Sequence, residues 1–308
     1  MSGAALELHE VCFRYSRRGP LVLDSLRMRV PTGAICAFVG ENGAGKTTAM
    51  SLVGGFLQPL EGAVHILGEE GFDAFRLKGR LGVLPQDAEL PLRHSATQFL
   101  RHLGRLQGLG RKAAAVEADR VLEVVSLADR GRSRIASLSH GMRRRVAVAS
   151  ALVGDPELVL LDEPLAGLDP SQAGGLRAAL GAAAGRRTLI VSSHNLHDLE
   201  RLCDWVVMID KGRCVRQGAL HEVVHTTRVI RWELASEAPL EALRAALPDH
   251  DFRGDNTALE QRAPDGVDLD EASLEVMRIL SARGIAVRGV RRGAALEDTF
   301  LAEVGSKG

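Results

Sequence analysis

The fold of this chain is decided by the stretch Gly40-Glu41-Asn42-Gly43-Ala44-Gly45-Lys46-Thr47-Thr48. It fits the pattern Gly-x-x-x-x-Gly-Lys-Ser/Thr, in which glycines let the backbone wind tightly and aim several N–H groups at phosphate oxygens. A helix that starts directly after such a loop adds positive charge from its N-terminus. In this pattern the Lys46 ammonium reaches the β- and γ-phosphates of a nucleotide, and the Thr47 hydroxyl binds Mg²⁺. The stretch therefore predicts a phosphate-binding loop.

The residues on either side of this loop supply the strand and the helix that it needs. Residues 34–39 are almost wholly apolar, which is typical of a strand buried on both faces, and a helical pattern runs from 46 to about 54. Further upstream, residues 6–9 and 26–30 alternate between apolar and polar side chains, which predicts a β-rich start.

Two acidic residues follow the apolar run at 158–161, namely Asp162 and Glu163. Adjacent carboxylates at the end of a buried strand are costly to hold there without a purpose. In a phosphate-loop enzyme Asp162 is placed to bind Mg²⁺, directly or through water, and Glu163 to polarise an attacking water. The alternative is a strand end whose acids only meet solvent.

The chain continues as alternating strands and helices. Strand patterns occur at 158–161, 188–192 and 205–209, with an Ala/Gly/Arg-rich helix predicted over 171–185. Such alternation favours a parallel sheet covered on both faces. Between about 87 and 150, apolar residues recur at helical spacing among many arginines, which predicts a helical insertion.

A second compositional unit begins near Thr226. Residues 228–308 hold 11 Lys/Arg and 15 Asp/Glu, whereas the whole chain holds 39 of each. Its patterns predict strands at 229–234, 257–261 and 286–290 and helices at 240–247 and 269–283. We therefore expect one domain over 1–224 and a small α+β domain over 228–308.

The composition excludes several classes of function. With no net charge, the chain lacks the basic excess of a non-specific nucleic-acid binder, so no nucleic-acid partner is predicted. No run approaches the roughly 18 apolar residues of a membrane span, and the first residues lack an apolar export signal. The four cysteines show no C-x-x-C spacing, which indicates reduced thiols in the cytoplasm.

The segment Leu138-Ser139-His140-Gly141-Met142 resembles the signature segment found only in ABC ATPases. In that family the positions of Ser139 and Gly141 open a helix and cap the γ-phosphate bound to the other subunit. His140 replaces the commoner Gly and Met142 the commoner Gln. The Ser-x-Gly-Met-Arg form is familiar from bacterial exporters of the second (ABC-2) class, so it indicates a subtype. A weakened or inactive composite site is the alternative.

Other positions fit the same family in order along the chain. Gln86 matches the glutamine loop that contacts Mg²⁺ and water, and Asp169 the loop that crosses the dimer interface. His194 ends a strand where the family places the histidine that contacts the γ-phosphate. Tyr15 stands where an aromatic ring stacks on adenine, with Phe13 as a nearby competitor. The resemblance implies these site residues: for catalysis Glu163, His194, Gln86 and Lys46; for the nucleotide Tyr15, Gly40, Asn42, Gly43, Ala44, Gly45, Lys46, Thr47, Thr48, Ser139, Gly141 and Asp169; for the metal Thr47, Gln86 and Asp162.

The resemblance covers residues 5–222, and residues 296–301 look like the closing segment of ATPases from the same exporter class. It implies an α/β fold: a phosphate-loop NTPase domain of the ABC type, with an antiparallel β subdomain and a helical insertion, before a small α+β domain. ATP and Mg²⁺ are the expected cofactors. The implied partners are a second copy, with a homodimer favoured, and a separate permease that holds the ATPase on the inner face of the plasma membrane.

Two rival functions are weighed against a transport ATPase. A soluble ABC ATPase acting on ribosomes or DNA usually carries two nucleotide cores or long coiled-coil insertions, and this chain has neither. A non-hydrolysing regulator is disfavoured because Lys46, Asp162, Glu163 and His194 are all present. The transported substrate is not predicted, since its contacts belong to the membrane subunit.

Overall fold

The structure is a computed structural model that describes residues 3–182, 184–225, 229–264, 267–292 and 296–305. Contacts divide the chain into two compact units, Met1–Leu220 and His221–Gly308, and each is described by itself. The expected domain boundary near Thr226 lies outside the described residues. Among the helices that the structure describes, none combines the length and apolarity needed to cross a bilayer.

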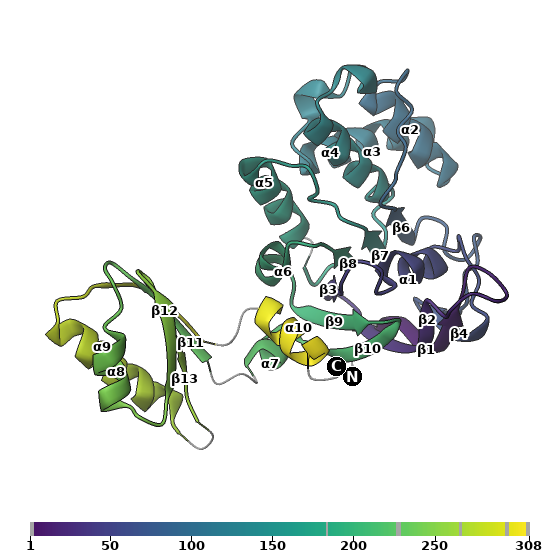
Figure 1. The fold of residues 1–308 in the computed structure, drawn as a ribbon. Coiled ribbons are helices and arrows are strands. Elements are labelled where there is room, and N and C mark those ends of the chain that lie inside the picture. The colour runs from purple at the N-terminus through teal and green to yellow at the C-terminus, as the bar shows by residue number, and fades with distance from the viewer. Residues whose placement is uncertain (1–2, 183, 226–228, 265–266, 293–295, 306–308) are drawn as a thin grey trace. The chain divides into compact units, whose positions relative to one another are not determined.

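The first unit is built on a six-stranded sheet in the order β10-β9-β3-β8-β7-β6 (Figure 1). Strand β3 pairs in parallel with β8 and β9, and β6 and β7 extend the parallel run, while β10 is antiparallel to β9. The predicted parallel sheet is thereby confirmed. Its strands are β3 (Ile35–Val39), β6 (Leu81–Leu84), β7 (Leu158–Leu161), β8 (Thr188–Ser192), β9 (Trp205–Asp210) and β10 (Arg213–Ala219).

Helix α1 (Lys46–Val53) joins this sheet to the β-rich start of the chain. Its Met50 and Val53 share one buried core with Phe38 of β3 and with Leu6 of the N-terminal strand. Burial of such apolar side chains supplies most of the driving force for packing the two layers together. The phosphate loop thus lies between a buried strand and a helix whose inner face packs against both sheets.

The N-terminal layer is an antiparallel sheet in the order β2-β1-β4-β5. Strands β4 and β5 were not predicted, because they carry little of the alternation that marked the first two. The bounds are β1 (Ala4–Phe13), β2 (Leu23–Pro31), β4 (Glu61–Ile66) and β5 (Glu69–Glu70).

The predicted helical insertion contains three helices and two 3₁₀ turns, and Figure 1 shows α2, α3 and α4 grouped together. The first helix starts at Ala96 because Ser95 caps it. The Ser95 hydroxyl accepts from the backbone N–H of Gln98, and Gln98 Oε1 accepts from the backbone N–H of Ser95. The elements are α2 (Ala96–Leu106), α3 (Arg111–Val124), η1 (Ala128–Arg130), η2 (Ile135–Ser137) and α4 (His140–Ala151).

Two helices stand between the last strands of this unit, α5 (Pro170–Gly181) and α6 (Leu196–Leu202). The helix predicted over 171–185 ends at Gly181. Four residues later Gly185 has φ +75, a left-handed conformation that cannot continue a helix, and its N–H donates to the Gly33 carbonyl.

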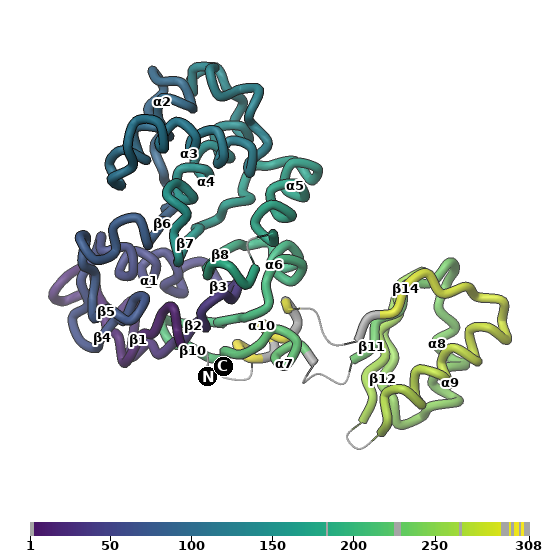
Figure 2. Tube along the Cα trace, turned by 180° about the vertical axis from the view of Figure 1, so that it is seen from behind, coloured from purple at the N-terminus to yellow at the C-terminus, as the bar shows by residue number. Residues whose placement is uncertain are grey.

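The second unit is a four-stranded antiparallel sheet in the order β12-β13-β11-β14, with α8 and α9 on one face (Figures 1 and 2). Trp232 lies at the centre of its core, and its Nε1–H donates to Gln261 Oε1 at 3.3 Å. The elements are α7 (Leu220–His225), which starts in the first unit, β11 (Val229–Leu234), α8 (Leu240–Ala246), β12 (Asp251–Asp255), β13 (Ala258–Arg262), α9 (Leu269–Ala282), β14 (Val287–Arg292) and α10 (Leu296–Gly305).

Candidate active site

The phosphate loop lies between β3 and α1, and steric constraints require glycine at several of its positions. Gly43 and Gly45 have φ +87 and +105, where L side chains are strained. A Cβ on Gly40 would stand 2.6 Å from the carbonyl oxygen of Ile209 on the neighbouring strand. The backbone of this loop can therefore take its path only with glycine at these positions.

Lys46 opens α1 and folds over the loop. Its Nζ donates to the carbonyl oxygens of Gly40 at 2.5 Å and Glu41 at 3.0 Å. Partial burial lowers the pKa of Lys46, and the nearby carboxylates of Glu163 and Asp162 act in the opposite direction. The ammonium therefore sits in a half-buried pocket that already contains negative charge.

The two threonines of the loop face different ways. Thr47 is exposed, and its hydroxyl donates to Gln86 Oε1 at 3.4 Å. Thr48 is buried, and its Oγ1 lies 3.0 Å from the Tyr15 hydroxyl. Tyr15 is 67% exposed, whereas Phe13 is buried and makes a T-shaped ring contact with it. Of the two aromatic rings considered for adenine, only Tyr15 offers a free face.

Asp162 is buried directly beyond the end of β7, and its side chain is held by a neighbour on β8. The Ser192 hydroxyl donates to Asp162 Oδ1 and accepts from the Glu163 backbone N–H at 3.0 Å. This contact orients both acids at once. Sequence reasoning assigned no role to Ser192, since a serine at a strand end gives no signal of its own.

Glu163 and His194 meet across the ends of two parallel strands. His194 Nδ1 lies 2.9 Å from Glu163 Oε2, and the imidazole is largely exposed while the carboxylate is mostly buried. Glu163 has φ +52, a conformation that non-glycine residues rarely adopt. Such strain is typical of residues whose direction matters for function.

The signature-like segment packs on the loop before α5. Ser139 caps α4, its hydroxyl accepting from the Met142 amide at 3.2 Å, and Asp169 caps α5 in the same way. A Cβ on Gly141 would stand 2.6 Å from Gln172 Oε1, and one on Gly167 would stand 2.7 Å from His140 Nε2.

The predicted site residues thus form two groups. Gln86, Glu163 and His194 join the phosphate loop and Asp162 at the carboxyl edge of the parallel sheet, where open α/β sheets bind their ligands. In the described part of the chain, no hydrogen bond connects Ser139 or Gly141 to the phosphate loop.

Comparisons with known proteins agree with this geometry. A family model described as ABC transporter matches residues 23–166. The daunorubicin resistance ATP-binding protein DrrA3 of Streptomyces coeruleorubidus is 34% identical over 284 residues, which cover 91% of this chain and 90% of that protein. The chain belongs to the ATP-binding proteins of ABC transporters. As a member of this ABC ATPase family it binds and hydrolyses ATP, as the sequence predicted.

A second relative is named for export, and a solved structure shares the fold. The Nod factor export ATP-binding protein I of Cupriavidus pinatubonensis is 32% identical over 304 residues, covering 97% of this chain and 90% of that protein. Among solved structures, cbiO1 of Clostridium perfringens superposes with a TM-score of 0.64 at 28% identity, over 71% of this chain and 90% of that one. The predicted likeness to exporter ATPases is confirmed, and an ABC ATPase acting on ribosomes or DNA is not favoured.

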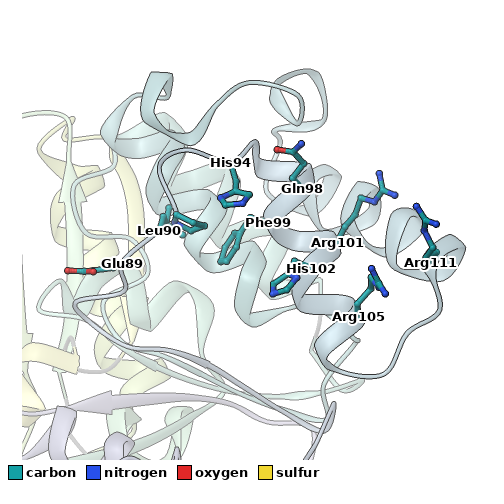
Figure 3. Close-up of a pocket in the computed structure, with 10 residues that line it drawn as sticks. Glu89, Leu90, His94, Gln98, Phe99, Arg101, His102, Arg105 and Arg111 are labelled. Atoms are coloured by element: carbon teal, nitrogen blue, oxygen red, sulfur yellow. The ribbon is translucent and has the colours of Figure 1, made fainter.

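The ABC ATPase also has a groove beside α2 with a volume of about 830 Å³. Leu90, Pro91 and Phe99 are apolar residues of its lining, and Figure 3 shows Phe99 and His102 on the same side of α2. Its remaining side chains are mostly cationic or titratable: Glu89, His94, Gln98, Arg101, His102, Arg105 and Arg111. Residues 90–116 contain five Lys/Arg and no Asp or Glu.

Proposed function

We propose that two copies of this ABC ATPase face each other head to tail and drive a separate permease of the ABC-2 exporter class. The observation that carries the ATP-driven part of the proposal is the meeting of Glu163 with His194, beside Asp162 and the phosphate loop, at one edge of the sheet. Phosphoryl transfer needs positioning and charge stabilisation more than covalent help, and this arrangement supplies both.

Each group receives a role that suits its chemistry. Lys46 neutralises the β- and γ-phosphates, Glu163 polarises the attacking water, and His194 contacts the γ-phosphate while holding Glu163. Tyr15 stacks on adenine. The backbone of Gly40 to Thr48 cradles the phosphates.

The same edge fits Mg²⁺. The hydroxyl of Thr47 and the amide oxygen of Gln86 lie 3.4 Å apart, and Asp162 adds a carboxylate whose direction Ser192 fixes. Oxygen donors with one carboxylate, completed by phosphates and water, are the ligand set that Mg²⁺ prefers. Thr47, Gln86 and Asp162 would hold the ion there, and it would supply positive charge against the phosphates.

Dimerisation supplies what the phosphate loop of one copy lacks. Ser139 and Gly141 stand at the N-terminus of α4, bonded to neither the loop nor Lys46 in the described residues. A helix N-terminus favours an anion, so this segment can cap a γ-phosphate carried by the facing copy, with Asp169 at the interface. One complete set of site residues in the chain favours a homodimer.

We assign the docking of the permease to the groove beside α2. In the described residues Arg101, Arg105 and Arg111 form no ion pair with an acid, so their charges are free for a partner. A cytoplasmic segment of the permease that carries Asp or Glu around an apolar residue suits this lining. Gln86 lies at the start of the same region and connects it to the nucleotide. Such docking places the ATPase on the cytoplasmic face of the plasma membrane.

Residues 1–224 then form the nucleotide-binding domain, with its helical subdomain over about 87–150, and residues 228–308 form an accessory domain. The accessory domain has its own core around Trp232 and carries none of the nucleotide-site residues. A regulatory or dimer-stabilising role is the one that suits it.

Charge reversal in the groove tests the transport role. The double variant Arg101→Glu, Arg105→Glu should keep the ATPase activity of the isolated subunit and lose recovery in membranes with the co-expressed permease. The matched control Arg186→Glu, Arg201→Glu changes two exposed arginines of the same unit and should be recovered like the unchanged protein. Equal membrane recovery of the two variants contradicts the docking assignment. Recovery of the unchanged protein with ribosomes or DNA contradicts the transport role.

A further inference from the structure

One guanidinium connects three backbone segments of the nucleotide site. Arg144 lies in the first turns of α4, and its Nη2 donates to the carbonyl oxygens of Asp162 at 2.6 Å and Glu163 at 2.8 Å. Its Nη1 donates to the carbonyl oxygen of Gln86 at 3.3 Å. One side chain therefore connects α4, the backbone of Asp162 and Glu163, and the glutamine loop at Gln86.

The two shorter hydrogen bonds lie on either side of Glu163. The carbonyl of Asp162 belongs to the peptide that enters Glu163, and the carbonyl of Glu163 belongs to the peptide that leaves it. Glu163 has φ +52, which a non-glycine residue keeps only when its surroundings hold it. By fixing both peptide planes, Arg144 fixes the direction in which the Glu163 side chain leaves the backbone.

The chemistry of arginine suits this task and that of lysine does not. The guanidinium is planar and offers several donors in a rigid fork, whereas an ammonium is a single compact point. Arg144 is partly buried, and that burial lowers its pKa while Asp162, Glu163 and Asp87 act against the shift. Its Nε finds no hydrogen-bond partner among the described residues, so its bonding is concentrated on the three carbonyls.

We propose that Arg144 is a positioning residue for ATP hydrolysis, which holds the backbone of Glu163 and connects it to the glutamine loop. The inference rests on the proposed role of Glu163. In the described residues the hydrogen bonds of the Arg144 guanidinium go to backbone carbonyls, and the phosphate loop is the part placed to bind the nucleotide. Its loss should therefore misplace the carboxylate without weakening ATP binding.

The next residue of the helix provides a matched control. Arg145 is also an arginine whose Nε lacks a partner in the described residues, and its Nη1 donates to the carbonyls of Val125 and Ser126, both at 3.1 Å. Those carbonyls belong to the helical region rather than to the nucleotide site. A purely structural role predicts equal effects at the two positions.

The experiment compares Arg144→Lys with Arg145→Lys in the full chain, by steady-state ATPase kinetics and thermal melting. Arg144→Lys should lower kcat about 30-fold, because a small misplacement of a catalytic group strongly lowers the rate. The KM for ATP should change by less than about twofold. Arg145→Lys should keep kcat within about twofold and lower the melting temperature by a similar amount. Should Arg144→Lys melt more than about 5 °C below the control, Arg144→Gln replaces it under the same criterion.

A double variant separates positioning from other roles. If Arg144 acts through Glu163, adding Arg144→Lys to Glu163→Gln should not lower the residual single-turnover rate further. A full additive loss, an unchanged kcat in Arg144→Lys, or a raised KM at constant kcat each overturns the inference. Full activity of Glu163→Gln alone contradicts instead the proposed role of Glu163, so the two failures are distinguishable.

Discussion

The imidazole Nδ1 of His194 lies 2.9 Å from the carboxylate Oε2 of Glu163. The two residues are separated by 31 positions and meet because they follow the ends of the neighbouring parallel strands β8 and β7. The carboxylate is mostly buried and the imidazole is largely exposed, so His194 can hold Glu163 and still be reached from solvent.

His194→Ala should therefore lower kcat about 100-fold, in the range that a positioned acid–base group contributes. The phosphate loop is untouched, so the affinity for ATP should change by less than about threefold. Steady-state phosphate release and equilibrium titration with a fluorescent ATP analogue measure the two quantities. A kcat within threefold of the unchanged protein contradicts the role given to His194.

Tyr15 makes a separable contribution to binding. Tyr15→Ala should weaken ATP binding about tenfold, since stacking of a base on an aromatic ring contributes on the order of 1–3 kcal/mol. Tyr15→Phe loses the hydrogen bond to Thr48 but keeps the ring, so it should bind within about threefold of the unchanged protein. Isothermal titration with ADP checks both variants. Equal losses in the two would assign the effect to the hydroxyl rather than to the ring.

The unusual His140 of the signature-like segment packs against Gly167, which has φ +74. Gly167→Ala should destabilise the first unit by about 1–3 kcal/mol, because a Cβ is strained at this φ and also meets the imidazole. Adding His140→Gly should recover part of that loss by removing the second cause. Urea unfolding followed by circular dichroism measures each step. If the double variant regains no unfolding free energy, the imidazole moves aside at no cost and the strain at Gly167 is the whole effect.

The second unit contains a buried chain of polar groups. Trp232 Nε1 donates to Gln261 Oε1, and Gln261 Nε2 lies 3.0 Å from His250 Nδ1. Gln261→Leu should cost about 2 kcal/mol of unfolding free energy, because the indole N–H loses its acceptor in the core. Arg253→Ala removes an exposed ion pair of the same unit and should cost less than about 0.5 kcal/mol. Tryptophan fluorescence during urea unfolding, in a Trp205→Phe background, compares the two.

Much of the nucleotide-binding fold follows from local sequence. Strands β7 and β8 begin and end at the predicted residues: β7 is wholly apolar, and in β8 three apolar residues stand between the buried Thr188 and Ser192. The phosphate loop can also be predicted from sequence, because its backbone geometry requires glycine at fixed positions. Gln86 and His194 were assigned through family resemblance, and Asp162 from the two acids that follow a buried strand.

What sequence could not supply are contacts made only in three dimensions. Ser192 reaches Asp162 across 30 positions, and Arg144 reaches Asp162 and Glu163 across 18 and 19. Neither residue has a local pattern that separates it from other serines and arginines. The edge strand β10 was not predicted for a different reason. It is partly exposed, so polar and apolar residues are mixed along it without a clear pattern.

The central claim is that Glu163 drives hydrolysis in a site shared by two copies. The most direct measurement is the Glu163→Gln variant with Mg²⁺ and ATP, followed by phosphate release and by sedimentation of the same sample. Hydrolysis should be at least 100-fold slower, with ATP still bound and the sedimenting mass doubled, because closure of the dimer needs ATP and its reopening needs hydrolysis. Hydrolysis at the rate of the unchanged protein, or a monomer that retains ATP, would contradict it.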